Sequence, residues 1–297
     1  MSKSAAAFLS IMILLLTLPA PSVAQQPMTV QKIKGDIYLV KGGSGANTGF
    51  YIGDKEVVII DSKMTADASR QVIAEIKKLT DKPITRIVLT HSDGDHVNGL
   101  NGFPPGLKIY GHPLMKSEME AAAKSPNAQH LLEYLPDQAC APCAASKESV
   151  MAFKVGSEDV ALYYFGPAHT SGDLVVYFPA QKVAFIGDLA FLGRDPLIHR
   201  QKGGTSLGYV NALKSMAALR ADTYLAGHND PLSSQDLQGL AESIAGKQEK
   251  VKTMVAEGKS LDQIKQAFGI TAPPAQPGRS SFPSLVEIIY LELTEKK

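Results

Sequence analysis

The sequence predicts an α/β protein in which two β-sheets carry helices on their outer faces. Strand-like segments fall into two blocks, residues 37–110 and 160–226, and helix-like segments with a periodic apolar face are interleaved with both. The composition, with 44% hydrophobic and 20% charged residues, is ordinary for a globular protein. It excludes a disordered, collagen-like or coiled-coil chain.

The first block is expected to begin as a β-hairpin. Strands are predicted at residues 37–40, 50–52 and 57–60, and the glycine-rich residues 42–45 form the first turn. These glycines do not predict a phosphate-binding loop, because a strand and not a helix follows them. Apolar residues recur at helical spacing in residues 67–79 and predict a helix. Two further strands are expected at residues 84–89 and 107–110.

The second block carries four predicted strands. They lie at residues 160–165, 174–178, 183–186 and 223–226, with a helix at residues 206–219 before the last. Between the blocks, residues 114–150 are expected to be an insertion that is helical at first and then interrupted by Pro and Cys. Helices at residues 234–256 and 260–268 follow, and a helical tail comes after about residue 271. The chain after residue 24 is predicted to be one domain, residues 25–297.

Residues 1–24 have the pattern of a secretory signal peptide. Lys3 precedes an almost unbroken apolar run at residues 5–18, and Ser22-Val23-Ala24 offers small residues to a signal peptidase. The run is shorter than the roughly 20 residues that a membrane span needs. We therefore expect cleavage after Ala24 and a periplasmic or secreted product that is not held in the membrane.

Charge and cysteine content restrict the partners and the redox chemistry. The chain has 30 basic and 29 acidic residues and loses one basic residue with the signal peptide, so the mature protein is formally neutral. This balance argues against binding to nucleic acid or to an anionic membrane. Cys140 and Cys143 are expected to form a local disulfide in an oxidising compartment. A redox pair is disfavoured because no thioredoxin-like pattern surrounds them.

Histidine and aspartate residues gather at four predicted strand ends. The densest run is residues 90–99, Thr-His-Ser-Asp-Gly-Asp-His-Val-Asn-Gly, directly after a buried strand. The candidate metal ligands are His91, Asp93, Asp95, His96, His169, Asp188 and His228. Imidazole and carboxylate together suit Zn²⁺, Fe or Mn, so this pattern predicts a metal site. Of the remaining histidines, His112 is expected to be structural, His130 to be a solvated helix residue, and His199 lacks a comparable context.

A serine hydrolase is a weaker alternative. Residues 204–208, Gly-Thr-Ser-Leu-Gly, fit the pattern of a nucleophile elbow, which requires a strand before the serine. The preceding residues are polar and broken by Pro and Gly. Ser206 is therefore expected to be the N-cap of the helix that follows.

The metal-ligand pattern resembles that of the metallo-β-lactamase superfamily. The signature of that family is His-x-His-x-Asp-His, followed by a His, a metal-bridging Asp and a final His. The residues that match it in order are His91, Asp95, His96, His169, Asp188 and His228. The resemblance extends over essentially the whole chain after the signal peptide. It implies a four-layer αβ/βα sandwich with a metal site at one edge.

The resemblance also implies how the ligands are divided. His91, Asp93 and His169 would form a first metal position, and Asp95, His96 and His228 a second, with Asp188 bridging the two. Two divalent ions, zinc by default, would hold a hydroxide that attacks the substrate, and Asp95 would orient it. Asp61, at the end of the strand at residues 57–60, either fixes the tautomer of a ligand histidine or caps the next helix.

One residue departs from the family pattern. Asp93 stands where the family usually has its second His, and the motif then resembles the His-x-Glu-x-Asp-His form of flavodiiron proteins, which hold two irons. The carboxylate lowers the net charge of the site by one unit and favours Fe or Mn relative to zinc. Arg194, His199 and Lys202 follow Asp188; they are expected to be solvated rather than to contact an anionic substrate group.

We therefore expect an exported metal-dependent hydrolase that acts on an ester, lactone, lactam or related small molecule. One alternative is a diiron oxidoreductase, prompted by Asp93 and disfavoured because no flavodoxin-like domain follows in this sequence. The other is a non-catalytic metal-binding protein. The resemblance does not choose the bond, because one scaffold serves many substrates in this superfamily. The oligomeric state is left open.

Overall fold

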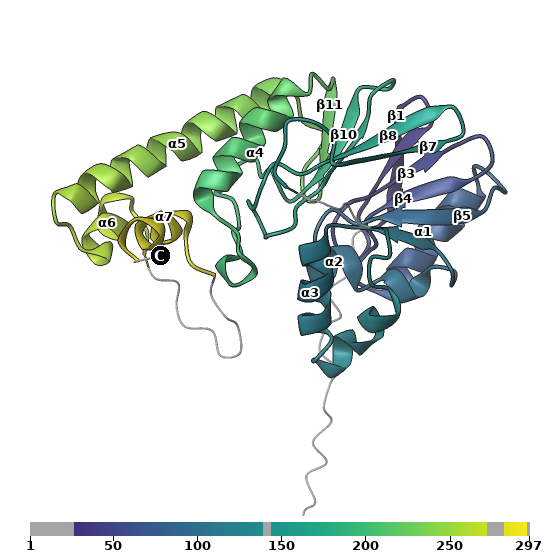
Figure 1. Cartoon of the computed structure of the whole chain (residues 1–297), viewed down its shortest axis with the longest axis horizontal. Helices are drawn as coiled ribbons and strands as arrows, with labels where there is room; N and C mark the ends of the chain where they lie inside the picture. The colour runs from purple at the N-terminus through teal and green to yellow at the C-terminus, as the bar shows by residue number, and fades with distance from the viewer. Residues whose placement is uncertain (1–26, 139–143, 272–281, 296–297) are drawn as a thin grey trace, which may run out of the picture.

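The two predicted sheets lie face to face between two layers of helices. A computed structural model describes residues 27–138, 144–271 and 282–295. Its layers run helix, sheet, sheet, helix (Figure 1), which confirms the αβ/βα sandwich. The predicted signal peptide, Cys140 and Cys143 lie outside the described residues, so cleavage and the disulfide stay predictions.

The first sheet has six strands in sequence order. They are β1 (Thr29–Lys34), β2 (Ile37–Lys41), β3 (Thr48–Ile52), β4 (Val57–Ile60), β5 (Ile84–Val88) and β6 (Lys108–Tyr110). The first four pair antiparallel through short connections, whereas β4, β5 and β6 are parallel and are joined by crossovers. All four residues of β4 are buried, as its uninterrupted apolar run requires of a strand covered on both faces.

The second sheet has five strands in the order β11-β10-β9-β8-β7. They are β7 (Met151–Val155), β8 (Glu158–Tyr163), β9 (Val175–Phe178), β10 (Val183–Gly187) and β11 (Thr223–Ala226). Strands β8, β9 and β10 alternate in direction, and β10 and β11 are parallel. Strands β8, β10 and β11 therefore run the same way, and their carboxyl ends share one edge of the sheet.

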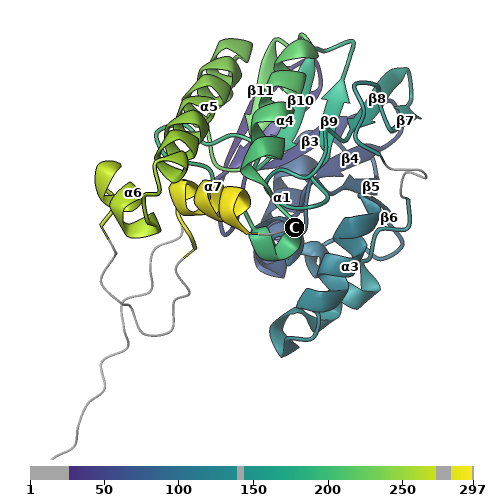
Figure 2. The same cartoon turned by 60° about the vertical axis from the view of Figure 1, so that its left-hand side comes forward.

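Helices cover the outer faces of both sheets, and three apolar clusters separate the layers. The first sheet packs against α1 (Ala66–Lys77), α3 (Pro113–Ala122) and η2 (Pro126–Glu133). The second packs against α4 (Ser206–Ala218), α5 (Ser234–Ala256), α6 (Leu261–Ala267) and α7 (Leu285–Thr294). Helix α5 begins beside β11 and extends away from the sheets toward α6 and α7, an arrangement that Figure 2 shows from a second side. The third cluster fills the space between the sheets.

The structure differs from the predicted elements at the sheet edges and at one helix start. Strands β1 and β7 were not predicted, because several residues of each are exposed and the apolar signal is weak. The N-cap of α4 is Thr205 and not Ser206, since the Thr205 hydroxyl accepts the Gly208 amide. Ser206 is buried and its hydroxyl donates to Glu292 of α7, so it does not have the exposed position of an elbow nucleophile.

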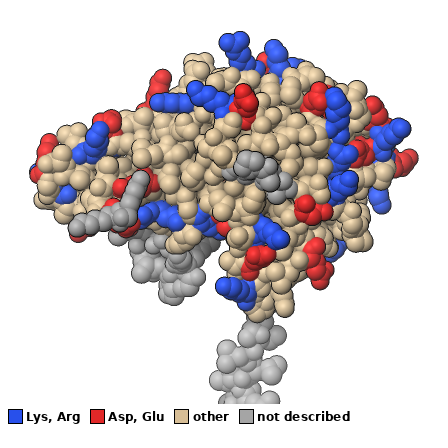
Figure 3. Space-filling model, in the orientation of Figure 1, with Lys and Arg blue, Asp and Glu red and all other residues tan. Residues whose placement is uncertain are grey.

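The predicted insertion and tail both carry packed structure. Residues 114–150 contain most of α3 and all of η2, which bury Met115, Met119 and Leu131 against the first sheet. The apolar face of α7 packs into the cluster over the second sheet. None of the described helices is long and apolar enough to cross a membrane. On the face shown in Figure 3, basic and acidic side chains are interspersed and much of the middle is uncharged.

Candidate metal centre

Four loops at one edge of the two sheets bring the predicted ligands together. They follow β5, β8, β10 and β11, and one short helix, α2 (Gly94–Val97), lies in the first of them. Among the described residues these side chains gather into three groups, and within each group the nitrogen and oxygen atoms lie within 4.8 Å of one another. These groups are His91, His169 and Asp188; Asp93, His169 and His199; and Asp95, His96 and His228. The structure therefore brings all seven predicted ligands to one place and adds His199.

Asp95, His96 and His228, the residues predicted for the second metal position, lie together. Nε2 of His228 lies 3.1 Å from Oδ2 of Asp95, and Nε2 of His96 lies 3.9 Å from the same oxygen. His96 is buried, whereas the side chains of Asp95 and His228 are 22% and 33% exposed. This group therefore forms the solvent-facing side of the centre.

Asp188 lies between the two metal positions. Its Oδ1 is 3.2 Å from Nε2 of His96, and its Oδ2 is 3.3 Å from Nε2 of His228 and 3.9 Å from Nε2 of His169. The close approach of β11 requires Gly227, because a Cβ there would collide with Asp188 and His96. One carboxylate thus faces three imidazoles from three different loops, as a bridging ligand must.

Asp93 points toward the first metal position. Its Oδ2 lies 3.1 Å from Nε2 of His169 and 3.8 Å from Nε2 of His91. Burial alone would raise the pKa of Asp93, but contacts with His169 and His199 outweigh it and hold that pKa well below its usual range. The side chain is therefore a carboxylate at neutral pH.

Asp61 fixes the orientation of two ligand histidines. It accepts hydrogen bonds from the Thr90 amide and hydroxyl, both at 2.7 Å, and its Oδ2 lies 2.8 Å from Nδ1 of His96. Since the Thr90 proton goes to Asp61, the Thr90 oxygen, 3.1 Å from Nδ1 of His91, accepts from that ring. Both rings then carry their proton on Nδ1 and leave Nε2 free for a metal. The alternative role of Asp61 as a helix cap is wrong, because Thr65 caps α1.

His169 is held in the same way by a backbone carbonyl. Its Nδ1 lies 2.7 Å from the Leu197 oxygen, which can only accept, so the neutral ring carries its proton on Nδ1 and its Nε2 faces the centre. The loop that carries it is tied down by Asp173, which accepts the amides of Ala168 and Thr170. Three histidines thus present Nε2 to one space.

The residues present fit a bound cation. Among the described residues, Nε2 of His91, Nε2 of His96 and Oδ1 of Asp188 are buried without a hydrogen-bond partner, although buried polar atoms are nearly always paired. Burial would lower the pKa of His169 and His228, but neighbouring carboxylates raise both to about 9. Without metal, these imidazoles therefore take up protons at neutral pH. A divalent ion would supply that positive charge and satisfy the unpaired atoms together.

Two residues of the centre were missed by the sequence analysis. His199 and Lys202 were expected in solvent, yet His199 Nε2 lies 2.8 Å from Oδ2 of Asp93 and Lys202 Nζ lies 2.6 Å from its Oδ1. Their position on the loop after Asp188 was the only signal that could have identified them. Arg194, on the same loop, instead lies over the ring of Phe191, 4.2 Å from its centroid.

The other two histidines lie outside the centre. His112 is buried and its Nδ1 accepts the Leu114 amide at the start of α3, which fits the predicted structural role. His130 is not the solvated residue that was expected, since its Nε2 lies 2.9 Å from the Asn98 oxygen and the contact is partly buried. It fixes the loop that begins with His91 against η2.

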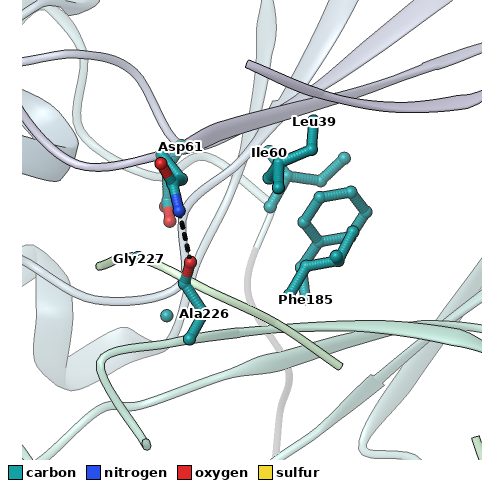
Figure 4. Close-up of a pocket in the computed structure, with 9 residues that line it drawn as sticks. Leu39, Ile60, Asp61, Phe185, Ala226 and Gly227 are labelled. Atoms are coloured by element: carbon teal, nitrogen blue, oxygen red, sulfur yellow. Dashed lines mark hydrogen bonds between the residues drawn. The ribbon is translucent and has the colours of Figure 1, made fainter. Parts of the chain in front are cut away.

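A small cavity lies beneath the centre, between the sheets. It has a volume of about 10 Å³, and its lining includes Leu39, Ile60, Asp61, Phe185 and Gly227 (Figure 4). The Asn47 amide beside it donates to the Ala226 oxygen at 2.9 Å, drawn as the dashed line, and so joins the two sheets. The cavity has room for about one water molecule and none for a substrate, which must approach from outside, where Asp95 and His228 are exposed.

Comparisons with known proteins identify the family and several relatives of this chain. The sequence profile of the metallo-beta-lactamase superfamily matches residues 42–228. The chain is 27% identical over 247 residues to a metallo-beta-lactamase type 2 of Elizabethkingia meningoseptica, covering 75% of this chain and 87% of that one. It is 25% identical over 223 residues to the 2,4-dinitroanisole O-demethylase subunit alpha of a Nocardioides species, covering 74% and 63%.

Two further likenesses concern a shorter segment and the fold. A segment of 47 residues is 47% identical to a linear primary-alkylsulfatase of a Pseudomonas species, which is 16% of this chain and 9% of that enzyme. A solved metallo-beta-lactamase from Pontibacter korlensis superposes with a TM-score of 0.59 at 19% identity, covering 73% of this chain and 99% of that one. The chain therefore belongs to the metallo-β-lactamase superfamily.

Proposed function

We propose that this protein is an exported hydrolase that uses two divalent metal ions to cleave an ester, lactone or lactam bond in a small molecule. The observation that supports it best is Asp188, whose carboxylate lies within 3.9 Å of Nε2 of His96, His169 and His228. With Asp93 on one side and Asp95 on the other, this arrangement offers two adjoining sets of nitrogen and oxygen donors. Such pairs of positions are typical of metal-dependent hydrolases.

Some residues of the centre would bind the two metal ions, and others would position or transfer protons. When bound, two divalent ions supply Lewis-acid polarisation of a substrate oxygen and acidify water. His91, Asp93 and His169 would hold one ion, and Asp95, His96 and His228 the other, with Asp188 shared. Asp61 keeps the proton of His96 on Nδ1, so the lone pair of His96 Nε2 stays free to bind a metal ion.

Asp95 is proposed to orient the attacking water and to carry its proton to the leaving group. Contacts with His228 and His96 outweigh burial and lower the pKa of Asp95, so this carboxylate is an acceptor at neutral pH. Its partial exposure lets it meet both solvent and substrate. Positioned proton transfer of this kind is worth about 10²- to 10⁴-fold in rate.

The surroundings of the centre favour a substrate with an apolar group beside the reacting bond. The ring of Phe191 stacks on His228 with centroids 5.8 Å apart, and Phe282 stands edge-on to His199 at 4.9 Å. Phe282 is 49% exposed and offers an apolar contact at this side of the centre. The relatives are named for β-lactams, alkyl sulfates and 2,4-dinitroanisole, an aryl ether, so the substrate panel must include these bonds beside carboxylic esters.

The test is hydrolysis by metal-free protein reconstituted with zinc, iron or manganese. The panel consists of nitrocefin, p-nitrophenyl acetate and octanoate, a γ-lactone, a linear primary alkyl sulfate, 2,4-dinitroanisole and p-nitrophenyl phosphate. We expect turnover of a carbonyl substrate that disappears with chelator and returns with metal, and a loss of at least about 100-fold in kcat for Asp95→Asn. Gln201→Ala, an exposed change on the neighbouring loop, is the matched control. Two bound ions without turnover of any substrate would instead favour a non-catalytic metal-binding protein.

Export is proposed from residues 1–24 alone. Protein recovered from the periplasm of a bacterial host should begin at Gln25, and deletion of residues 2–24 should leave it in the cytoplasm. Mass spectrometry of the intact chain distinguishes the two forms. An uncleaved Met1 on the periplasmic protein would contradict cleavage after Ala24.

A further inference from the structure

His199 is fixed against the first metal position by its own backbone. Its amide donates to the His169 oxygen at 2.8 Å, and its carbonyl accepts the amides of Lys202 and Gly204 at 2.9 and 3.0 Å. The short helix η3 (Arg200–Lys202) follows directly. Gly204 packs so closely on His169 that a Cβ there would collide with the His169 carbonyl. The loop is therefore tied to a ligand histidine, and the His199 ring is only 12% exposed.

The ring of His199 points its Nε2 at the carboxylate of Asp93, at the predicted first metal position. Nε2 lies 2.8 Å from Oδ2 of Asp93, and the ring stands perpendicular to that of His169 with centroids 4.9 Å apart. Yet this Nε2 is buried and makes no aligned hydrogen bond with any described residue. His199 Nε2 and Asp93 Oδ2 are thus close without an aligned N–H···O bond. Two ligand atoms that point at the same metal ion have this geometry.

The spacing of these atoms matches that of ligands around one ion. Nitrogen and oxygen ligands about 2.1 Å from an ion lie about 3.0 Å apart at right angles and about 3.4 Å apart at tetrahedral angles. Oδ2 of Asp93 lies 2.8 Å from His199 and 3.1 Å from His169. The other Asp93 oxygen is engaged by Lys202, so a single oxygen remains to face these nitrogens. One carboxylate oxygen and two imidazoles thus surround a shared point.

We propose that His199 is a metal ligand of the first position, beside Asp93 and His169 and next to His91. The imidazole that the motif lacks at residue 93 is then supplied by the loop after β10. The resulting set of three imidazoles, from His91, His169 and His199, and one carboxylate, from Asp93, suits Zn²⁺ as well as Fe²⁺. This inference rests on the proposed metal site but not on the proposed reaction.

The experiment measures metal binding and not turnover. Metal-free wild type, His199→Ala and His199→Gln are titrated with Co²⁺, which reports its ligands by visible absorption, and with Zn²⁺ against a competing chelator. We expect both variants to keep one tight ion, to lose affinity for the other by more than about 100-fold, and to lose the same part of the cobalt spectrum. Residues that only support a ligand typically change affinity about 10- to 100-fold, which sets this threshold.

The controls separate a ligand from a hydrogen-bonding residue. Gln can still donate to Asp93, so wild-type cobalt binding by His199→Gln, with loss in His199→Ala, would overturn the inference in favour of a supporting contact. Wild-type binding by both variants would also overturn it. Gln201→Ala must bind as wild type, and His91→Ala should lose the same ion as His199→Ala; melting of the metal-free proteins checks that each variant folds. If the wild-type protein binds no ion at all, both the proposed function and this inference fail. If the wild-type protein binds two ions and both His199 variants bind them equally well, only this inference is contradicted.

Discussion

The ammonium group of Lys202 lies 2.6 Å from Oδ1 of Asp93, the residue that departs from the family motif. Lys202 also donates to the Ser92 hydroxyl at 2.8 Å and its side chain is 26% exposed. The charge count made from the sequence assigned Asp93 one uncompensated negative charge. The positive charge of Lys202 compensates it, so the Asp93–Lys202 pair has the net charge of the neutral imidazole that the family motif would place at residue 93. The expectation that the site is less positive than usual is therefore corrected.

Removal of the Lys202 charge should strengthen binding of a divalent ion at the first position. A unit charge about 5 Å from a divalent ion is worth more than 1 kcal/mol even at the dielectric constant of water, so Lys202→Met should tighten zinc about tenfold or more. Lys202→Arg keeps the charge and should stay close to wild type. Chelator competition measures both constants. Weaker binding by Lys202→Met would mean that Lys202 matters more for orienting Asp93 than for its charge.

Restoring the family histidine should help only if the lysine is removed with it. In Asp93→His, the new imidazole would lie beside Lys202 and three other histidines, and we expect the first ion to bind less tightly than in wild type. In Asp93→His/Lys202→Met the usual charge of the family is restored, and zinc affinity should recover. Elemental analysis and zinc titration of the two variants give the comparison. Equal binding by both would show that residue 93 and Lys202 act independently.

The metal-free protein should become less stable as the pH rises toward 9. Neighbouring carboxylates raise the pKa of His169 and His228 from 6.5 to about 9 in the folded chain, against the effect of burial. Between these values the folded state binds more protons than the unfolded state, so stability falls with increasing pH. Metal binding needs neutral imidazoles, so the rise in melting temperature on adding zinc should grow over the same range.

Calorimetric melting of the metal-free protein at pH 6.5, 7.5, 8.5 and 9.5 tests this sign. His228→Ala should flatten part of the decline, since it removes one of the two groups. If the stability of the metal-free protein rises from pH 7 to 9, His169 and His228 do not form charged contacts with the neighbouring carboxylates.

Asp61→Asn should weaken the second metal position without unfolding the protein. Asp61 has a positive φ of 59°, a conformation that Asn tolerates well, so the backbone is preserved. The amide cannot accept from both His96 and Thr90 as the carboxylate does, and we expect a loss of metal affinity of about 10- to 100-fold. Asp230→Asn, at a carboxylate that is 79% exposed, is the control. Unchanged affinity in Asp61→Asn would show that packing alone orients His96.

The sequence by itself determined the layers of the fold and the principal ligands. Buried strands such as β4 and β5 are continuous apolar runs, and helices such as α1 and α5 repeat their apolar residues at helical spacing, so local pattern is sufficient to place them. The ligands follow strands that run the same way, and a strand end is visible in sequence as the point where an apolar run meets polar residues. Edge strands β1 and β7 were missed because one of their faces is in solvent.

Only the tertiary structure decided what surrounds Asp93. Lys202 and His199 lie more than 100 residues from it in the chain, on a polar loop with no periodic pattern, and nothing local distinguishes them from solvated residues. They reach Asp93 because the loop after β10 is bonded to His169, which itself follows a different strand. Contacts made between loops depend on how the two sheets meet, and that relation is a property of the packed core rather than of any segment of sequence.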